Sequence, residues 1–203
     1  MRLTGKGSVM KHSLKITFNS PVILIFVFLC FASTLLGSLT LGKSTWFLFT
    51  TYHSSLHSPL TYVRFFTHVL GHSGWEHLIG NVSYLLLLGP ILEEKHGSVH
   101  ILEVILVTAL ITGVVNYVFF PQVALCGASG VVFAFILLTS FTDFRKGEIP
   151  VTFLLVAAFY IGQQVYEGIA VQSNVSNLSH ILGGMIGAVF GYQMNQKRPY
   201  DGI

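Results

Sequence analysis

The sequence predicts an all-α membrane protein, a bundle of six transmembrane helices. Three observations support this fold class. First, 52% of the 203 residues are hydrophobic and only 9% are charged, whereas about a quarter of the residues in a typical soluble domain are charged. Second, six apolar segments follow one another along the chain. Third, the basic residues gather at alternate ends of these segments, as the positive-inside rule requires of repeated membrane crossings.

The first predicted span runs from Pro21 to Gly42 and contains no charged residue. A transmembrane helix needs about 20 apolar residues, and this segment has that length. It is too long for the core of a signal peptide, and no small-residue cleavage site follows it. We therefore expect residues 1–20 to form a short basic cytoplasmic segment, residues 21–196 the six-helix membrane domain, and residues 197–203 a short cytoplasmic tail.

A long connection from Lys43 to Gly74 follows the first span and is rich in aromatic residues and histidine. A connection of this length in so small a chain usually has structure of its own. Aromatic side chains concentrate at the membrane–water interface, so we expect this segment to pack there.

Five further spans follow this connection. The second span begins in polar sequence at about Glu76 and ends at about Leu92, before a charged run. The last four spans are Val104 to Phe120, Ser129 to about Phe141, Pro150 to Tyr166, and Leu178 to Met194. The span that begins at Ser129 is short, and at a rise of about 1.5 Å per residue it covers only part of the bilayer.

The distribution of basic residues predicts an N-in, C-in topology. Six spans return the chain to the side on which it started, and an excess of Lys and Arg marks the cytoplasmic side. The opposite side carries only Lys43 and Arg64. In this topology Ser129 begins its helix at the outer end, and His180 lies in the outer half of the last helix. The basic residues on the inner side are Arg2, Lys6, Lys11, Lys15, Lys95, Arg145, Lys146, Lys197 and Arg198.

Ser129 lies among small residues, between Gly127 and Gly130, at the start of an apolar segment. With no large neighbours, its hydroxyl is open to a substrate carbonyl. His180 lies in another apolar segment. A serine hydroxyl is a poor nucleophile until a neighbouring base takes its proton. A serine and a histidine at one depth therefore suggest hydrolysis inside the bilayer.

His77 and Asn81 are four residues apart in the second span, so a helix places them on one face. Both side chains can donate hydrogen bonds. Polar groups are costly inside a membrane and by default indicate function. The alternative is that they only hydrogen-bond between helices.

Together these residues resemble the motifs of the rhomboid intramembrane serine proteases. The resemblance covers roughly Thr61 to Tyr192, and the first span matches in kind only. A single motif of this length is weak evidence, but three motifs on the second, fourth and sixth spans are strong evidence. They are His77-x-x-x-Asn81, Gly127-x-Ser129-Gly130 and His180-x-x-Gly183-x-x-x-Gly187, with further matches at Arg64, His72 and Glu93.

The resemblance implies a role for each of these polar residues. Ser129 would be the nucleophile and His180 its base, while His77, Asn81 and the Ser129 backbone N–H would form the oxyanion site. Each preorganised donor of this kind contributes about 10²–10³ in rate. No carboxylate lies near His180 in the sequence. We therefore expect a Ser–His dyad whose imidazole is oriented by packing, without the acid of a triad.

Two positions depart from the family pattern. Phe133 stands where many bacterial members have tyrosine, and Val63 stands where a tryptophan usually precedes the loop arginine. A phenyl ring can still stack on His180. For Arg64 and Glu93 we expect structural roles, the first tying loop carbonyls together and the second making contacts at the inner end of its helix.

Three glycines repeat every four residues in the last span: Gly183, Gly187 and Gly191. Small residues let membrane helices approach one another closely. The stripe shares a face with His180. We expect it to bring His180 within hydrogen-bond reach of Ser129.

Two alternatives compete with a serine protease. The chain has nine histidines, but Glu76-His77 does not continue into an HExxH-type zinc pair, so we expect no metal and no cofactor. The other alternative is a catalytically inert rhomboid-like protein that binds membrane clients. Such relatives generally lack the serine or the histidine, and this chain has both.

The expected partners are membrane-protein substrates and the lipid bilayer. The resemblance implies cleavage near small or helix-breaking residues at the outer membrane boundary. The basic residues form no stripe, so we expect no nucleic-acid partner, and no obligate protein partner is evident. We expect the chain in a bacterial cytoplasmic membrane, with its active site open to the outer face; an organellar membrane is the alternative.

Overall fold

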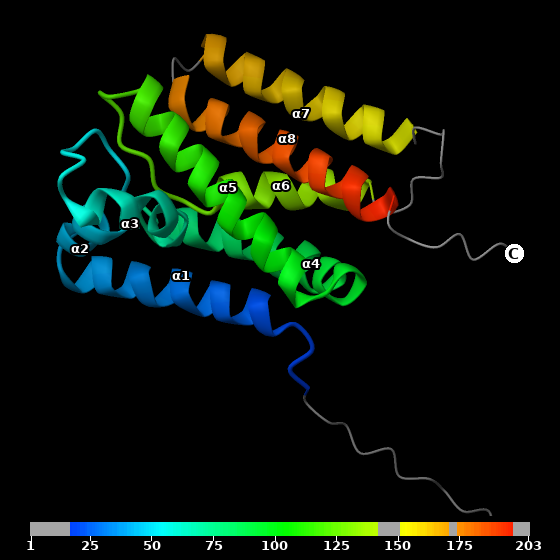
Figure 1. Cartoon of the computed structure of the whole chain (residues 1–203), viewed down its shortest axis with the longest axis horizontal. Helices are drawn as coiled ribbons and strands as arrows, with labels where there is room; N and C mark the ends of the chain where they lie inside the picture. Colours follow the sequence, from blue (N-terminus) through cyan, green and yellow to red (C-terminus); the bar gives the residue numbers. More distant parts are fainter. Residues whose placement is uncertain (1–16, 142–150, 171–173, 197–203) are drawn as a thin grey trace, which may run out of the picture.

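The computed structural model describes residues 17–141, 151–170 and 174–196, and helices dominate all three ranges (Figure 1). Within them, the only β pairing is an isolated bridge between Thr51 and Leu125. The all-α prediction is therefore confirmed for these ranges. The elements are α1 (Pro21–Leu39), α2 (Lys43–Leu48), α3 (Pro59–Thr67), the 3-10 helix η1 (His68–Leu70), α4 (Trp75–His96), α5 (Ser98–Phe119), α6 (Ser129–Ser140), α7 (Val151–Ala170) and α8 (Asn174–Gln196).

Each predicted span coincides with one of the longer helices, namely α1, α4, α5, α6, α7 or α8. The largest difference is at α5, which begins at Ser98, six residues before the predicted Val104. Only Gly97 separates α5 from α4, with a φ of 85° that glycine adopts without steric cost. The first turns of α5 carry His100 and Glu103. A hydropathy pattern marks where a helix becomes apolar. It therefore places the start of α5 too late, after its polar first turns.

Length and composition support two crossings directly. Among the described residues, α1 and α5 are long and apolar enough to span a membrane, and α6 is apolar but shorter. Most of the basic residues behind the topology prediction lie outside the described residues, as do most of residues 1–20 and all of residues 197–203. These basic residues are Arg2, Lys6, Lys11, Lys15, Arg145, Lys146, Lys197 and Arg198. Six crossings and the N-in, C-in orientation therefore stay predictions.

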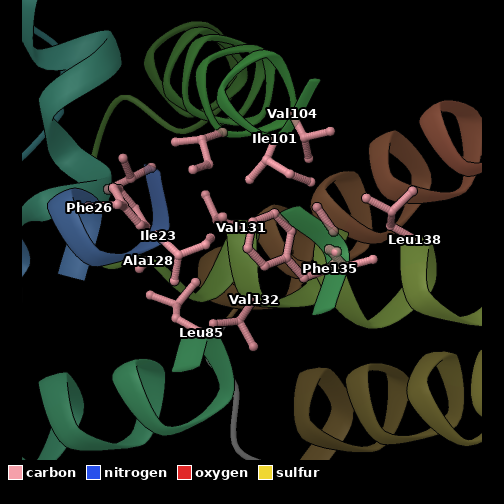
Figure 2. Packing of buried hydrophobic residues seen from close by; sticks show 14 of the residues in the cluster. Ile23, Phe26, Leu85, Ile101, Val104, Ala128, Val131, Val132, Phe135 and Leu138 are labelled. Atoms are coloured by element: carbon pink, nitrogen blue, oxygen red, sulfur yellow. The ribbon is translucent and has the colours of Figure 1, made fainter. Parts of the chain in front are cut away.

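Helix α6 lies inside the bundle, in contact with α4, α5 and α8, while α7 packs on the outer side of α8 (Figure 1). Val131 and Phe135 of α6 are fully buried. Figure 2 shows them between Ile101 of α5 and Leu85 of α4. Helices inside a membrane gain no free energy from leaving water, so close packing of this kind is what holds them together. The first residue of α6, Ser129, is thus carried by the most enclosed helix.

The carboxylate of Glu93 joins α4 to the start of α1. It accepts hydrogen bonds from the backbone N–H groups of Val22 and Ile23, each at 3.0 Å, and from the Ser98 hydroxyl at 2.7 Å. The first N–H groups of a helix have no partner within the helix, and a negative charge there is favourable. Glu93 is buried, so the structural role expected for it is confirmed.

The connection between α1 and α4 has its own structure, as predicted, and contains α2, α3 and η1. Arg64 of α3 organises it. The Arg64 Nε donates to the Phe47 carbonyl at 2.8 Å, and the guanidinium lies 4.4 Å from the centre of the Tyr52 ring. Trp46 stacks on Tyr52 at 4.8 Å. The expected tie between Arg64 and a loop carbonyl is confirmed.

Candidate functional site

Ser129 is the first residue of α6, and Ala128 precedes it as the N-cap. The backbone N–H groups of a first helical turn are free to bind an anion. Two sets of backbone contacts fix the segment that leads to Ser129. The N–H of Gly127 donates to the His68 carbonyl at 2.9 Å, and Leu125 exchanges two backbone hydrogen bonds of 2.9 Å with Thr51. The serine therefore has a defined position at the helix start.

The imidazole of His77, in the first turn of α4, lies against Gly127. A Cβ built on Gly127 would lie 2.8 Å from Cε1 and 2.9 Å from Nε2 of His77, and 3.8 Å from the Ser129 Oγ. The His77 ring and the Ser129 hydroxyl therefore both lie within 4 Å of one point beside Gly127. Gly127 also has a φ of 134°, a value that favours glycine. Only a residue without a side chain leaves room for the His77 ring at this point.

Asn81 lies one turn after His77 on α4, as the sequence predicted, and is buried. Its Nδ2 donates a hydrogen bond to the His77 carbonyl at 3.1 Å. An amide nitrogen carries two hydrogens, so a second donor remains for another acceptor. The hydrogen bond holds Asn81 in a fixed orientation beside His77.

His180 of α8 packs against Phe133 of α6. The two ring centres are 4.4 Å apart with an angle of 45° between the planes. Phe133 lies four residues after Ser129, which is one helical turn. The predicted contact between a phenyl ring and His180 is confirmed, with the two rings tilted and not stacked.

The glycine stripe of α8 is the contact surface for α6. A methyl group at Gly183 would overlap the carbonyl of Gly130, and one at Gly187 would overlap the carbonyl of Ala134. A Cβ at Gly191 would lie 2.5 Å from the Cβ of Phe141. The two backbones are therefore in direct contact at Gly183 and Gly187, while Gly191 meets the side chain of Phe141. This contact holds His180 at the level of the first turn of α6.

Two further side chains surround the His77 ring. His72 meets it edge to face, with ring centres 5.0 Å apart, and the Ser73 Oγ lies 3.2 Å from its Nδ1. The His72 Nδ1–H donates to the Leu70 carbonyl at 3.1 Å. The pKa of His72 is lowered from 6.5 to about 4, first by burial and then by the nearby charge of His77, and the bond to Leu70 opposes the shift. His72 is therefore neutral at pH 7.

His68 supports the site from behind. Its carbonyl holds Gly127, and its Nε2–H donates to the Ala109 carbonyl at 3.0 Å. Burial lowers the pKa of His68 from 6.5 to about 4, and the bond to Ala109 opposes this shift. A buried neutral imidazole thus connects η1, α5 and the approach to Ser129.

A pocket of about 360 Å³ opens beside this group of residues. His72, Ser73 and Cys126 line it on the side of the site, and hydroxyl side chains line much of the rest. A pocket of this size, lined in part by hydroxyl groups, has room for several water molecules. The other lining residues are Thr34, Gly37, Ser38, Leu41, Gly42, Thr45, Trp46, Thr50, Gly74 and Ala124.

The structure brings His77 and Ser129 to one place and holds His180 on the ring of Phe133 nearby. Sequence reasoning missed Ser73 and treated Gly127 only as a small neighbour of Ser129. The signal for Ser73 was its spacing, four residues before His77. In the part of the chain that the structure describes, no group of three His, Cys, Asp or Glu side chains gathers at a point that could hold a metal ion.

Comparison with known proteins gives one consistent family. Residues 59–197 match the model of the Rhomboid domain. Rhomboid-related protein 2 of Mus musculus is 32% identical over 158 residues, which are 68% of this chain and 52% of that protein.

Two further relatives come from different lineages. Rhomboid-like protein 11, chloroplastic, of Arabidopsis thaliana is 25% identical over 155 residues, 69% of this chain and 55% of that protein. The Rhomboid protease GlpG of Haemophilus influenzae is 29% identical over 135 residues, 64% of this chain and 68% of that protein. The chain thus spans about half the length of the mouse and plant relatives.

Proposed function

The chain belongs to the rhomboid family, and we propose that it is an intramembrane serine endopeptidase that cleaves membrane proteins in or next to their transmembrane segments. One observation carries the proposal. The His77 ring packs against Gly127, where a side chain would otherwise be, and the Ser129 hydroxyl lies within 4 Å of the same point. This is the arrangement that a nucleophile and an oxyanion donor need, because both must reach one carbonyl group.

In the proposed mechanism, His180 takes the hydroxyl proton as the Ser129 Oγ attacks the peptide carbonyl carbon. The tetrahedral intermediate collapses when His180 returns this proton to the leaving amine, and an acyl-enzyme remains. A water molecule, deprotonated by His180, then attacks the ester carbonyl. This second step releases the carboxylate product and restores Ser129.

The oxyanion of the tetrahedral intermediate would be bound by three donors: the His77 Nε2–H, the second Asn81 amide hydrogen and the Ser129 backbone N–H. Hydrocarbon cannot stabilise this charge, and the N-terminal end of α6 adds a favourable dipole. No carboxylate is required to orient His180 in this mechanism, because the ring of Phe133 packs against it. The catalytic pair is then a Ser–His dyad.

The proposed substrates are transmembrane segments that unwind locally. The backbone groups of a helix are already hydrogen-bonded and shielded, so a carbonyl becomes accessible only where small or helix-breaking residues loosen the helix. Water would reach the acyl-enzyme through the pocket lined in part by His72 and Ser73. The proposed setting is a bacterial cytoplasmic membrane, crossed six times, with the pocket on the outer face.

The test is reconstitution in liposomes with a generic single-span substrate and a fluorophosphonate probe. Ser129→Ala and His180→Ala should abolish both cleavage and labelling. A matched control is Ser140→Ala on the same helix, where the hydroxyl bonds only to its own helix at Ile136; it should cleave normally.

Three outcomes would contradict the proposal. Cleavage that persists in Ser129→Ala refutes the nucleophile, and cleavage that a chelator abolishes indicates a metal enzyme. Membrane-client binding without cleavage, unchanged in Ser129→Ala, indicates an inert binding protein. For the oxyanion site, His77→Ala and Asn81→Ala should each lower kcat by about 10²–10³ without unfolding the protein. A variant with unchanged kcat would remove that residue from the site.

A further inference from the structure

We propose that Ser73 is a positioning residue for His77. Its hydroxyl holds the imidazole so that the opposite edge of the ring faces Gly127 and Ser129. The inference deepens the proposed function and rests on it, because it assigns the residue that orients one oxyanion donor.

The geometry of the His77 ring is the first support. The Ser73 Oγ lies 3.2 Å from Nδ1, while Cε1 and Nε2 face the position that a Cβ on Gly127 would occupy. One ring nitrogen therefore meets Ser73 and the other is directed to the space beside the Ser129 Oγ. The His72 ring, at an angle of 69° to the His77 ring, packs against a third side.

The chemistry of a neutral imidazole is the second support. Such a ring has one N–H donor and one acceptor nitrogen. His77 can donate to an oxyanion from Nε2 only in the tautomer whose Nδ1 is an acceptor, and the Ser73 O–H is a donor that satisfies this Nδ1. His72 is unsuited to this task, because its own Nδ1–H is engaged by the Leu70 carbonyl and its Nε2 is an acceptor.

The timing of the interaction decides its kinetic effect. In the ground state His77 can exchange between its two tautomers, because a serine hydroxyl can donate or accept. When negative charge develops near Nε2, only the Nε2–H tautomer is productive, and the bond from Ser73 to Nδ1 then contributes. An interaction that strengthens in the transition state raises kcat and leaves KM unchanged.

The experiment compares Ser73→Thr with Ser73→Val in the full chain, reconstituted with the single-span substrate. The two side chains have the same shape, and only threonine keeps the hydroxyl. Ser73→Thr should retain kcat within about twofold, and Ser73→Val should lower it by about 3- to 10-fold with KM unchanged, the range that one hydrogen bond supplies.

A spectroscopic measurement and a control complete the test. The ¹⁵N chemical shifts of His77, measured on the phosphonylated protein, should show a hydrogen-bonded acceptor Nδ1 in wild type and in Ser73→Thr, and a changed Nδ1 in Ser73→Val. Ser83→Ala, on an exposed part of α4 where the hydroxyl bonds to the Ile79 carbonyl, should leave kcat and these shifts unchanged.

The outcomes separate this inference from the proposed function. If Ser73→Val and Ser73→Thr share the same kcat while the wild type cleaves and Ser129 is labelled, the role of Ser73 is wrong and the protease stands. If the wild type neither cleaves the substrate nor is labelled at Ser129, the proposed function itself is wrong, and the role of Ser73 is wrong with it. A loss in Ser73→Val that appears in KM alone also overturns the positioning role.

Discussion

At Gly127 the absence of a side chain decides what the neighbouring residues can do. The His77 ring already occupies the place of a methyl group there. At the same residue, the N–H is held by the His68 carbonyl and the backbone has a φ of 134°. Three separate constraints therefore meet at one position two residues before Ser129. A change at Gly127 acts on the nucleophile and on the oxyanion donor together.

Gly127→Ala should lower kcat/KM by about 10²-fold, because a methyl group displaces the His77 ring and a shift of about 1 Å in a catalytic group has this effect. Cleavage of the reconstituted substrate measures the loss. Gly80→Ala is the matched control, since Gly80 lies on α4 with no atom within 4 Å of its added Cβ. Equal activity of the two variants would contradict the crowding at Gly127.

The buried imidazoles predict that the protein loses stability in acid. The pKa values of His68 and His72 are lowered from 6.5 to about 4 by burial, so between these values the unfolded chain binds more protons than the folded one. Stability is then complete above pH 6.5 and falls as the pH decreases toward 4. Each shift corresponds to about 3 kcal/mol when fully expressed.

Unfolding in detergent at pH 7 and pH 4.5 measures this dependence. His72→Gln should reduce the difference in unfolding free energy between the two conditions. His100→Gln is the control, because His100 is exposed and bonds only to the carbonyl of His96. A pH dependence that is the same in His72→Gln and in wild type would show that His72 does not contribute.

Motif spacing correctly predicted on which helices the polar residues of the candidate site lie. Ser129, His77 and Asn81 lie where the sequence placed them on their helices, and the ring of Phe133 meets His180. The spacing of motifs in the sequence did not identify the roles of Ser73 and of the His68 carbonyl. Their contribution depends on where η1 and the start of α4 meet the chain before Ser129, and this is a property of tertiary packing.

Among the helices, the joint between α4, α5 and α1 shows how one side chain serves three elements. Glu93 near the end of α4 accepts hydrogen bonds from the first turn of α1 and from Ser98 at the start of α5. Gly97 makes the turn between α4 and α5 in a single residue. The three helices therefore share one polar contact at this end of the bundle.

Glu93→Ala should lower the free energy of unfolding by about 3 kcal/mol, because it leaves buried donors without an acceptor. Glu94→Ala removes an exposed neighbouring carboxylate and should change the free energy of unfolding by less than about 0.5 kcal/mol. Denaturation of both variants in detergent measures the difference. Similar stabilities would mean that water replaces the carboxylate at the start of α1.

Hydropathy predicted the six long helices because each carries a run of apolar residues that is easily recognised. It did not predict the bounds of α2 and α3, which are short and mix apolar with polar residues. Their positions depend on contacts such as the one between Arg64 and the Phe47 carbonyl. A side chain that bonds to a backbone group 17 residues away leaves no periodic signal in the sequence.

For the whole molecule, the charge distribution predicts that both termini lie on the cytoplasmic side. Tags at Met1 and Ile203 should resist protease added to intact spheroplasts, and a protease site inserted after Leu56, between α2 and α3, should be cut. The protein should stay with the membrane in alkaline carbonate. A terminal tag that is cut from outside, or an inserted site that is protected, would reverse the topology.

The length of α6 has a consequence for the depth at which its first residue lies. Its 12 residues measure about 18 Å at 1.5 Å per residue, while the hydrocarbon layer of a bilayer is about 30 Å thick. The two ends of this helix cannot both reach the lipid headgroups. Because α4, α5 and α8 enclose α6, protein surrounds it where lipid would otherwise meet its ends, so its first residue can lie below the level of the headgroups while the surrounding helices reach them.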